Sequence, residues 1–303
     1  MVAHHPFTTG AAVAALLAIS PATPRAQAIQ RAMYVSVLNE AGAPVADLGP
    51  SDFIVREDNL AREVLRVAPA VEPMQVAILV DNSQAAAPYI TDLRVALREF
   101  VTAMTAPSDS NGKNELAIVA LADRPTPLTD YTTSRAQLLK GIDKVFSVPQ
   151  SGTLLLEAVV DASKGLRTRA AARPVIVAIT TEGPELSDRH YDLVLEPLRN
   201  SGAAFHAIVV GHLAAGLTDA ERDRDMVLDR GTRETGGRRD NVLTSMSLSA
   251  KLKEVGDELM HQYRVTYAHP QSLIPPDRVT VAAARPGMTA RGVLVRERDP
   301  RTP

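Results

Sequence analysis

The sequence predicts an α/β fold, a Rossmann-like open and mostly parallel sheet with helices on both faces, plus a small flanking β unit. Three observations lead to this class. Nearly continuous apolar runs recur in the middle of the chain, and such runs are typical of strands buried on both faces of a parallel sheet. Amphipathic segments with helical spacing separate the runs. Alternating strands and helices favour right-handed crossovers within one sheet.

The apolar and amphipathic segments place the central elements in order. Buried strands are expected at residues 75–80, 116–121, 175–179 and 205–210. Helices are expected at residues 89–104, 135–146, 154–166, 192–198, 218–228 and 248–260. In the first of these helices, apolar side chains recur every three or four residues and so share one face. Residues 231–239 contain two adjacent glycines, which indicates a loop.

Segments rich in β-strand patterns flank this central region on both sides. Short strands are expected before it at residues 33–38, 53–55 and 64–67, and after it at 263–267, 279–283 and 292–295. The polar residues 56–59, three of them charged, indicate a hairpin between the second and third of these strands. The chain is thereby divided into a signal peptide, an N-terminal β segment, an α/β domain and a C-terminal β segment, at residues 1–28, 29–72, 73–262 and 263–303. We expect the two β segments to pack together as one unit.

The first residues resemble an export signal. A short apolar run from residue 10 to residue 20 precedes two prolines and the sequence Ala26-Gln27-Ala28, which is the pattern of a secretory signal peptide. The run is too short to span a bilayer, and no later stretch approaches the roughly 20 apolar residues of a span. Export to the periplasm or the cell exterior is therefore expected. The alternative is a disordered or mis-assigned N-terminus, because the segment before the run carries no Lys or Arg.

The composition argues against several classes of function. The 33 Lys and Arg nearly balance the 35 Asp and Glu, whereas nucleic-acid binders commonly carry an excess of positive charge. The absence of cysteine excludes disulfides, thiolate zinc sites and a cysteine nucleophile. Neither a dinucleotide-binding nor a phosphate-binding glycine motif occurs, and the histidines lack catalytic or metal-binding spacing. We therefore expect no enzymatic activity, and a hydrolase is the least favoured alternative.

The loop after the first buried strand is the candidate site, because ligands of open α/β sheets bind at the carboxyl ends of the strands. Asp81 and Ser83 stand two residues apart in this loop. Their oxygens suit a hard cation such as Mg²⁺ or Ca²⁺. A purely structural interpretation stays open: Asp81 and Ser83 cap the helix that follows and tie down the loop, and Thr153 caps the helix at residue 154.

Four motifs in order resemble those of von Willebrand factor type A (VWFA) domains. Residues 76–83 resemble the family's first strand and its D-x-S-x-S metal loop, and residues 151–158 resemble its G-G-T loop. Residues 175–183 resemble the strand that ends in T-D-G, and residues 235–238 resemble the T-G-G that precedes the last helix. The resemblance extends from about residue 73 to residue 263. The flanking segments at residues 42–45, 52–53 and 262–267 resemble those of exported bacterial VWFA-related proteins of unassigned role.

The resemblance implies a metal-ion-dependent adhesion site (MIDAS), in which side-chain oxygens and waters hold a cation and a partner's carboxylate completes its shell. Asp81, Ser83 and Thr153 match three positions of that site. Ala85 replaces the second serine, and Glu182 replaces the final aspartate. Because affinity follows the charge and number of ligands, the resemblance implies a degenerate site that binds Mg²⁺ or Ca²⁺ weakly.

The function expected from the sequence is that of an exported protein-interaction module for adhesion or assembly. Its protein partner would complete the metal shell with an acidic side chain, and the substitution Asp81→Ala is expected to abolish that binding at little cost in stability. A metal-independent structural scaffold is the alternative.

Overall fold

The computed structural model describes residues 1–2, 29–107, 112–211, 218–271, 276 and 278–296. Almost all of the predicted signal peptide lies outside these residues. No helix among them is long and apolar enough to cross a membrane.

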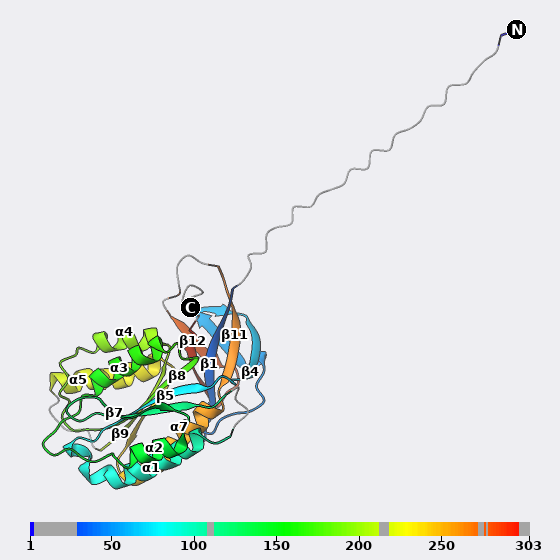
Figure 1. Ribbon diagram of the computed structural model, residues 1–303. Helices are drawn as coiled ribbons and strands as arrows, with labels where there is room; N and C mark the ends of the chain where they lie inside the picture. Colours follow the sequence, from blue (N-terminus) through cyan, green and yellow to red (C-terminus); the bar gives the residue numbers. More distant parts are fainter. Residues whose placement is uncertain (3–28, 108–111, 212–217, 272–275, 277, 297–303) are drawn as a thin grey trace.

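A six-stranded sheet forms the centre of the molecule (Figure 1), with the strand order β10-β9-β8-β5-β6-β7. The strands are β5 (Met74–Val80), β6 (Glu115–Ala120), β7 (Thr126–Thr132), β8 (Arg173–Thr181), β9 (Ala204–Val210) and β10 (Arg239–Val242). All neighbours pair in parallel except β6 and β7. The four predicted buried strands thus lie in one mostly parallel sheet, which confirms the predicted fold class.

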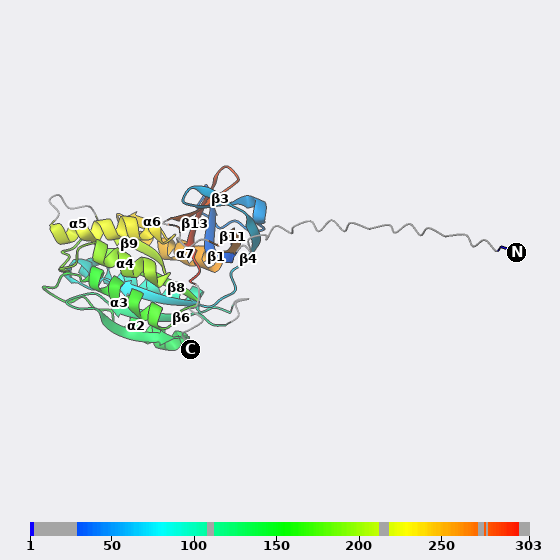
Figure 2. The same ribbon diagram turned by 90° about the horizontal axis from the view of Figure 1, so that it is seen from above.

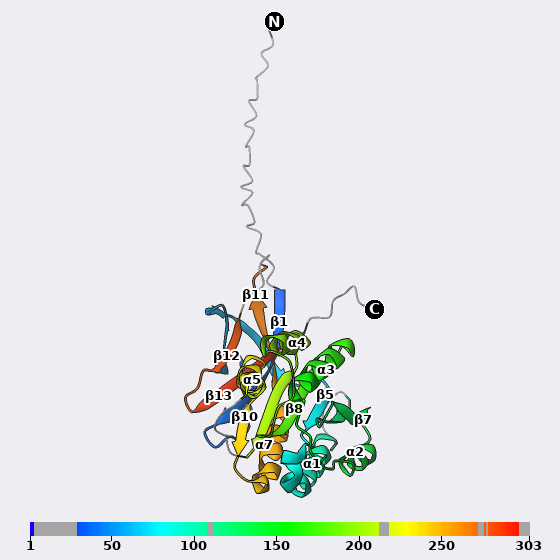
Figure 3. The same ribbon diagram turned by 90° about the vertical axis from the view of Figure 1, so that its left-hand side faces the viewer.

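Helices cover both faces of this sheet (Figure 3). One face packs against α1 (Ile90–Met104), α2 (Arg135–Ile142) and α7 (Leu248–Met260). The other face packs against α3 (Leu155–Thr168), α4 (Asp192–Ser201) and the turn after α5 (Asp219–Met226). α2 ends four residues earlier than expected, because the Arg94 side chain and the Asn82 side-chain amide bond to the carbonyl oxygens of Val145 and Phe146. These bonds draw the chain towards the end of β5.

The predicted loop at residues 231–239 contains more structure than expected. It begins with the short helix α6 (Thr232–Glu234) and ends at β10, which the sequence did not indicate. Gly237 lies so close to β9 that a Cβ there would be 1.8 Å from the carbonyl oxygen of Phe205. Only glycine therefore permits the chain to approach β9 before it pairs as β10.

The N- and C-terminal segments pair with each other in two antiparallel sheets. The first has the order β13-β1-β11-β4 and contains β1 (Ile29–Asn39), β4 (Val64–Pro69), β11 (Tyr263–His269) and β13 (Met288–Leu294). The second has the order β12-β2-β3 and contains β2 (Phe53–Glu57), β3 (Leu60–Arg62) and β12 (Val279–Ala283). Met33 of β1, for example, is paired with both Val265 and Leu294. We call these two sheets the β unit; they enclose one shared apolar core.

A hairpin was expected between the strands at residues 53–55 and 64–67. The first strand does form a hairpin, but its partner is β3 and not the strand at residues 64–67. Asp58 and Asn59 both have positive φ angles, so the turn is tight and Glu57 pairs directly with Leu60 of β3. The residues of β4 pair instead with β11 in the other sheet.

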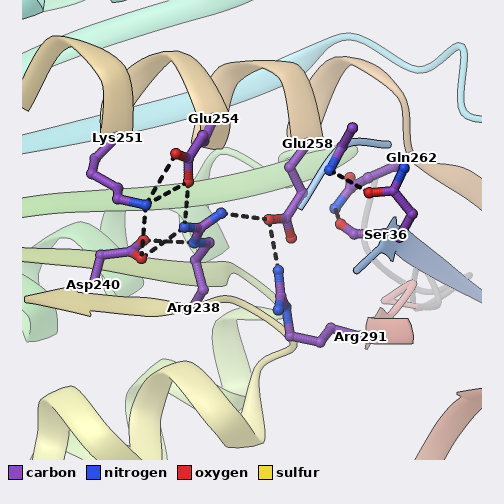
Figure 4. A network of polar contacts seen from close by, with 10 residues as sticks. Ser36, Arg238, Asp240, Lys251, Glu254, Glu258, Gln262 and Arg291 are labelled. Carbon is purple, nitrogen blue, oxygen red and sulfur yellow. Dashed lines mark hydrogen bonds and ion pairs between the residues drawn. The ribbon is translucent and has the colours of Figure 1, made fainter. Parts of the chain in front are cut away.

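The β unit lies beside the α/β domain (Figure 2), and a network of charged side chains joins the two (Figure 4). Glu258 of α7 has a fully buried carboxylate, which accepts a hydrogen bond of 2.7 Å from Arg291 of β13. Arg238 lies 3.8 Å from the same carboxylate and also pairs with Asp240 and Glu254. A buried charge is tolerated only when it is paired, so this network fixes the β unit against α7.

Candidate functional site

Asp81 follows the last residue of β5 and is almost completely buried. Its Oδ1 accepts a hydrogen bond of 2.8 Å from the Ser83 backbone N–H. Its Oδ2 accepts bonds from the backbone N–H and the hydroxyl of Thr181, at 2.9 and 2.6 Å. Because β5 and β8 are parallel neighbours, this carboxylate ties the carboxyl ends of two strands together. We therefore expect Asp81→Ala to cost more stability than the sequence alone indicated.

Ser83 and Thr153 are both fully buried, and among the described atoms their hydroxyl oxygens have no hydrogen-bond partner. Ser83 stands before the short 3-10 helix Gln84–Tyr89, but its side chain makes no cap hydrogen bond. Thr153 is not the N-cap of α3, because Leu154 holds that position. The capping interpretation is therefore wrong for both hydroxyls. Buried polar groups normally have a partner, so these two oxygens remain available to a ligand.

Three loops meet where these residues lie. The Thr153 backbone N–H donates to the carbonyl oxygen of Pro184 at 2.9 Å. A Cβ at Gly183, the residue before Pro184, would lie 3.7 Å from the Ser83 Oγ and 2.4 Å from the Ala85 Cβ. Ser83 and Thr153 therefore flank the same segment at the carboxyl edge of the sheet.

The end of β8 presents Thr181, rather than Glu182, to Asp81. Successive side chains of a strand point to opposite sides, and Glu182 lies against Gly211 at the end of β9, where a Cβ would be 3.7 Å from the Glu182 Cγ. Ala85 contributes a methyl group and no oxygen. Among the described residues, no group of three or more His, Asp or Glu could hold a metal ion. The side chains that flank this segment thus offer one carboxylate and two hydroxyls that lack a partner among the described atoms.

This set of oxygens fits a divalent cation only weakly. Mg²⁺ is commonly bound through one or two carboxylates, with waters in its remaining positions. Asp81 would supply the charge, and the Ser83 and Thr153 hydroxyls would supply neutral oxygens. Both oxygens of Asp81 already accept hydrogen bonds, which reduces what the carboxylate offers to an ion.

A second buried acid that the sequence did not indicate lies beside this edge. Glu185 accepts a hydrogen bond of 3.1 Å from the Leu155 backbone N–H at the start of α3. Burial raises the pKa of Glu185 to about 7. The Ser187 hydroxyl lies within hydrogen-bond distance of the carboxylates of both Glu185 and Glu157. These bonds hold the loop after β8 against α3.

Exposed apolar side chains occur in several of the loops near this edge of the sheet. Phe146 and Leu186 are 61% and 53% exposed, and Leu243 and Met246, after β10, are 66% and 86% exposed. The Arg94 guanidinium lies 4.3 Å from the centre of the Phe146 ring. Large apolar side chains that gather on a surface commonly mark a contact with another molecule.

Comparison with known proteins supports the fold. No family model matches the sequence, and no curated protein matches it. Proximal thread matrix protein 1 from the mussel byssus is 18% identical with a TM-score of 0.51, over 68% of this chain and half of its own. A von Willebrand factor type A protein from Catenulispora acidiphila is 12% identical with a TM-score of 0.48, over 90% of this chain and 74% of its own.

A third similar structure is the vWF domain of the type V pili tip protein Mfa5 from Porphyromonas gingivalis. It is 11% identical with a TM-score of 0.47, and the match covers 63% of this chain and 96% of that domain. The α/β domain of the present chain has an α/β fold like that of von Willebrand factor type A domains. At these identities the likeness establishes the fold alone.

Proposed function

We propose that this chain is a protein-interaction module that binds its partner at the carboxyl edge of the six-stranded sheet. One observation carries the proposal: two fully buried hydroxyl oxygens, of Ser83 and Thr153, lack partners among the described atoms and flank the loop beside the buried Asp81 carboxylate. An unsatisfied buried polar group costs about 1–3 kcal/mol. A site that a ligand completes accounts for this cost.

The ligand we propose is a divalent cation, Mg²⁺ or Ca²⁺, together with an acidic side chain of the partner. Asp81, Ser83 and Thr153 would hold the ion, and Glu182 would join them only if its side chain turned away from Gly211. With a single carboxylate in place, affinity in the absence of a partner belongs at the weak, millimolar end of the range for these ions. The partner's carboxylate would then supply the missing charge.

The exposed apolar side chains around the edge support a protein as the ligand. Protein interfaces combine an apolar centre with a polar and hydrated rim, and Phe146 and Leu186 provide apolar area close to the oxygen cluster. We also propose that the chain is exported, with residues 1–28 as its signal peptide, and that it has no catalytic residues.

A metal-independent scaffold is the second candidate, and one observation favours it. Both oxygens of Asp81 are already used to hold the loop after β5 and the end of β8. In that case the carboxylate has a structural role, and partner contact depends on the apolar surface alone.

Site-specific photocrosslinking in the native host distinguishes these candidates. A photoreactive amino acid at Leu186 tests the edge, and the same residue at Leu60 of the β unit, which is 63% exposed, is the matched control. We expect an adduct from position 186 and none from position 60. Asp81→Asn and a chelator should each remove the adduct. An adduct at position 186 that survives both treatments supports the scaffold, and an adduct from position 60 alone contradicts both candidates.

A further inference from the structure

A cavity of about 200 Å³ opens between α3 and the edge strand β7. Its floor consists of apolar side chains of β5 and β6, namely Ala77, Leu79, Ala117 and Val119. Pro127 and Tyr131 of β7 form one wall, and α3 forms the other. The cavity lies on the face of the sheet, so it is separate from the carboxyl edge that holds Asp81.

Small residues of α3 keep the cavity open. Ala158, Ala162 and Gly165 line it, and their spacing places them on one face of the helix. A Cβ at Gly165 would meet no atom within 4 Å, so packing does not require glycine there. Glycine in a helix interior is destabilising relative to alanine. At this position it leaves space that a larger and more helix-favouring residue would fill.

Two carboxylates stand at the rim of the cavity, and no Lys or Arg is among the residues that line it. Asp130 and Asp161 both line it and are exposed. Within the described part of the chain, neither forms an ion pair; Asp130 accepts only the backbone N–H of Tyr131, at 2.7 Å. The neighbouring cation Arg169 lies over the Tyr131 ring and 3.8 Å from Glu115, which balances part of its charge. The rim is therefore negative.

We propose that this cavity is a second contact surface, which receives a lysine side chain of a partner protein. The aliphatic stem would lie on the apolar floor, and the ammonium group would remain at the rim beside Asp130 and Asp161. Lysine side chains commonly bury their stems in this way while the charge stays in water. An apolar cavity of roughly 150 Å³ accommodates benzene, so 200 Å³ offers room for a four-carbon stem.

A titration followed by NMR on the isotope-labelled protein tests the chemistry of the cavity. The probes are n-butylammonium, butan-1-ol, and a blocked Ala-Lys-Ala tripeptide. We expect butylammonium to shift the backbone amide signals of Gly165 and Tyr131 saturably. Exposed ion pairs contribute little individually, so butanol should bind roughly two- to tenfold more weakly. The peptide should bind at least as tightly as butylammonium.

Variants that fill the cavity or remove its charge complete the test. Gly165→Leu should abolish the shifts caused by all three probes, while Gly165→Ala should retain most of the binding. Both replacements favour the helix, and the amide spectrum of each variant shows directly whether it is folded. The double variant Asp130→Asn/Asp161→Asn should weaken butylammonium binding roughly two- to tenfold and leave butanol binding unchanged. Glu196→Gln is the charge control, because Glu196 is an exposed acid on α4.

Four results would each overturn the proposal. These are the absence of saturable shifts at the cavity, undiminished binding to Gly165→Leu, equal affinity for butanol and butylammonium, and binding of butylammonium without binding of the lysyl peptide. The last result would identify a site for small amines. Because Asp81, Ser83 and Thr153 take no part in this titration, its failure leaves the proposed function of the carboxyl edge untouched.

Discussion

Replacement of His206 by leucine should make the protein less sensitive to acid. His206 lies in β9, is fully buried, and has no hydrogen-bond partner at either ring nitrogen among the described atoms. The charged groups around it are Glu258 of α7, Arg291 of β13, and Arg238 and Asp240 at β10. Burial is the main cause that lowers the pKa of His206 to about 4.

The size of the effect follows from the difference between the folded and unfolded states. An unperturbed histidine has a pKa of about 6.5, and each unit of difference corresponds to about 1.36 kcal/mol. Between pH 6.5 and pH 4 the unfolded chain binds a proton that the folded chain does not, so stability falls as the pH falls. With a folded pKa of about 4, the loss through His206 approaches about 3 kcal/mol at pH 4.

Urea unfolding at pH 7.5, 5.5 and 4.5 measures this contribution. Because the imidazole makes no hydrogen bond, His206→Leu should cost little at pH 7.5. At pH 4.5 the variant should retain about 2–3 kcal/mol more of its stability than the parent does. His190→Leu, at an exposed position, is the control. If parent and His206→Leu lose stability equally between pH 7.5 and pH 4.5, the buried neutral imidazole is not the cause.

Three further substitutions test the packing and charge contacts, each by urea unfolding at pH 7.5. Asp81→Ala should cost about 2–4 kcal/mol, because it leaves three hydrogen-bond donors unpaired; a cost below about 0.5 kcal/mol would contradict the geometry. Gly183→Ala should destabilise the protein, because its Cβ would lie 2.4 Å from that of Ala85. Adding Ala85→Gly should restore much of the lost stability, and a double variant that stays as unstable as Gly183→Ala would contradict this clash as the cause. Arg291→Ala should cost about 3 kcal/mol, because the fully buried Glu258 loses its closest partner; a neutral result would mean that Glu258 is uncharged.

The strands that the sequence reveals are those whose burial is continuous. β5, β8 and β9 are buried almost throughout, so their apolar runs are unbroken. The edge strand β7 is half exposed and contains Pro127, and its sequence has no clear alternation. β10 is short and charged, and it depends on pairing with β9 and on ion pairs such as Arg239 with Asp225. Tertiary contacts of this kind leave no periodic pattern.

The candidate site is only partly visible in the sequence. The motif at the end of the first buried strand identified Asp81 and Ser83, and the loop before α3 identified Thr153. The contact between Thr181 and Asp81 depends on which residue at the end of β8 faces β5. A shift of one residue in the strand would turn the Thr181 side chain to the opposite face of the sheet. Glu185 becomes buried only because its loop folds back on α3. The residues next to it in the sequence give no sign that its side chain is buried.

A magnesium titration by NMR tests most directly whether Asp81, Ser83 and Thr153 act as one oxygen cluster. The amide signals of Ser83, Thr153 and Thr181 should shift saturably, with an affinity near the millimolar range. The shifts should be absent in Asp81→Asn and strongly reduced in both Ser83→Ala and Thr153→Val. Signals that do not move at magnesium concentrations tenfold above that range, or that move equally in Asp81→Asn, would contradict a metal-assisted site at this edge.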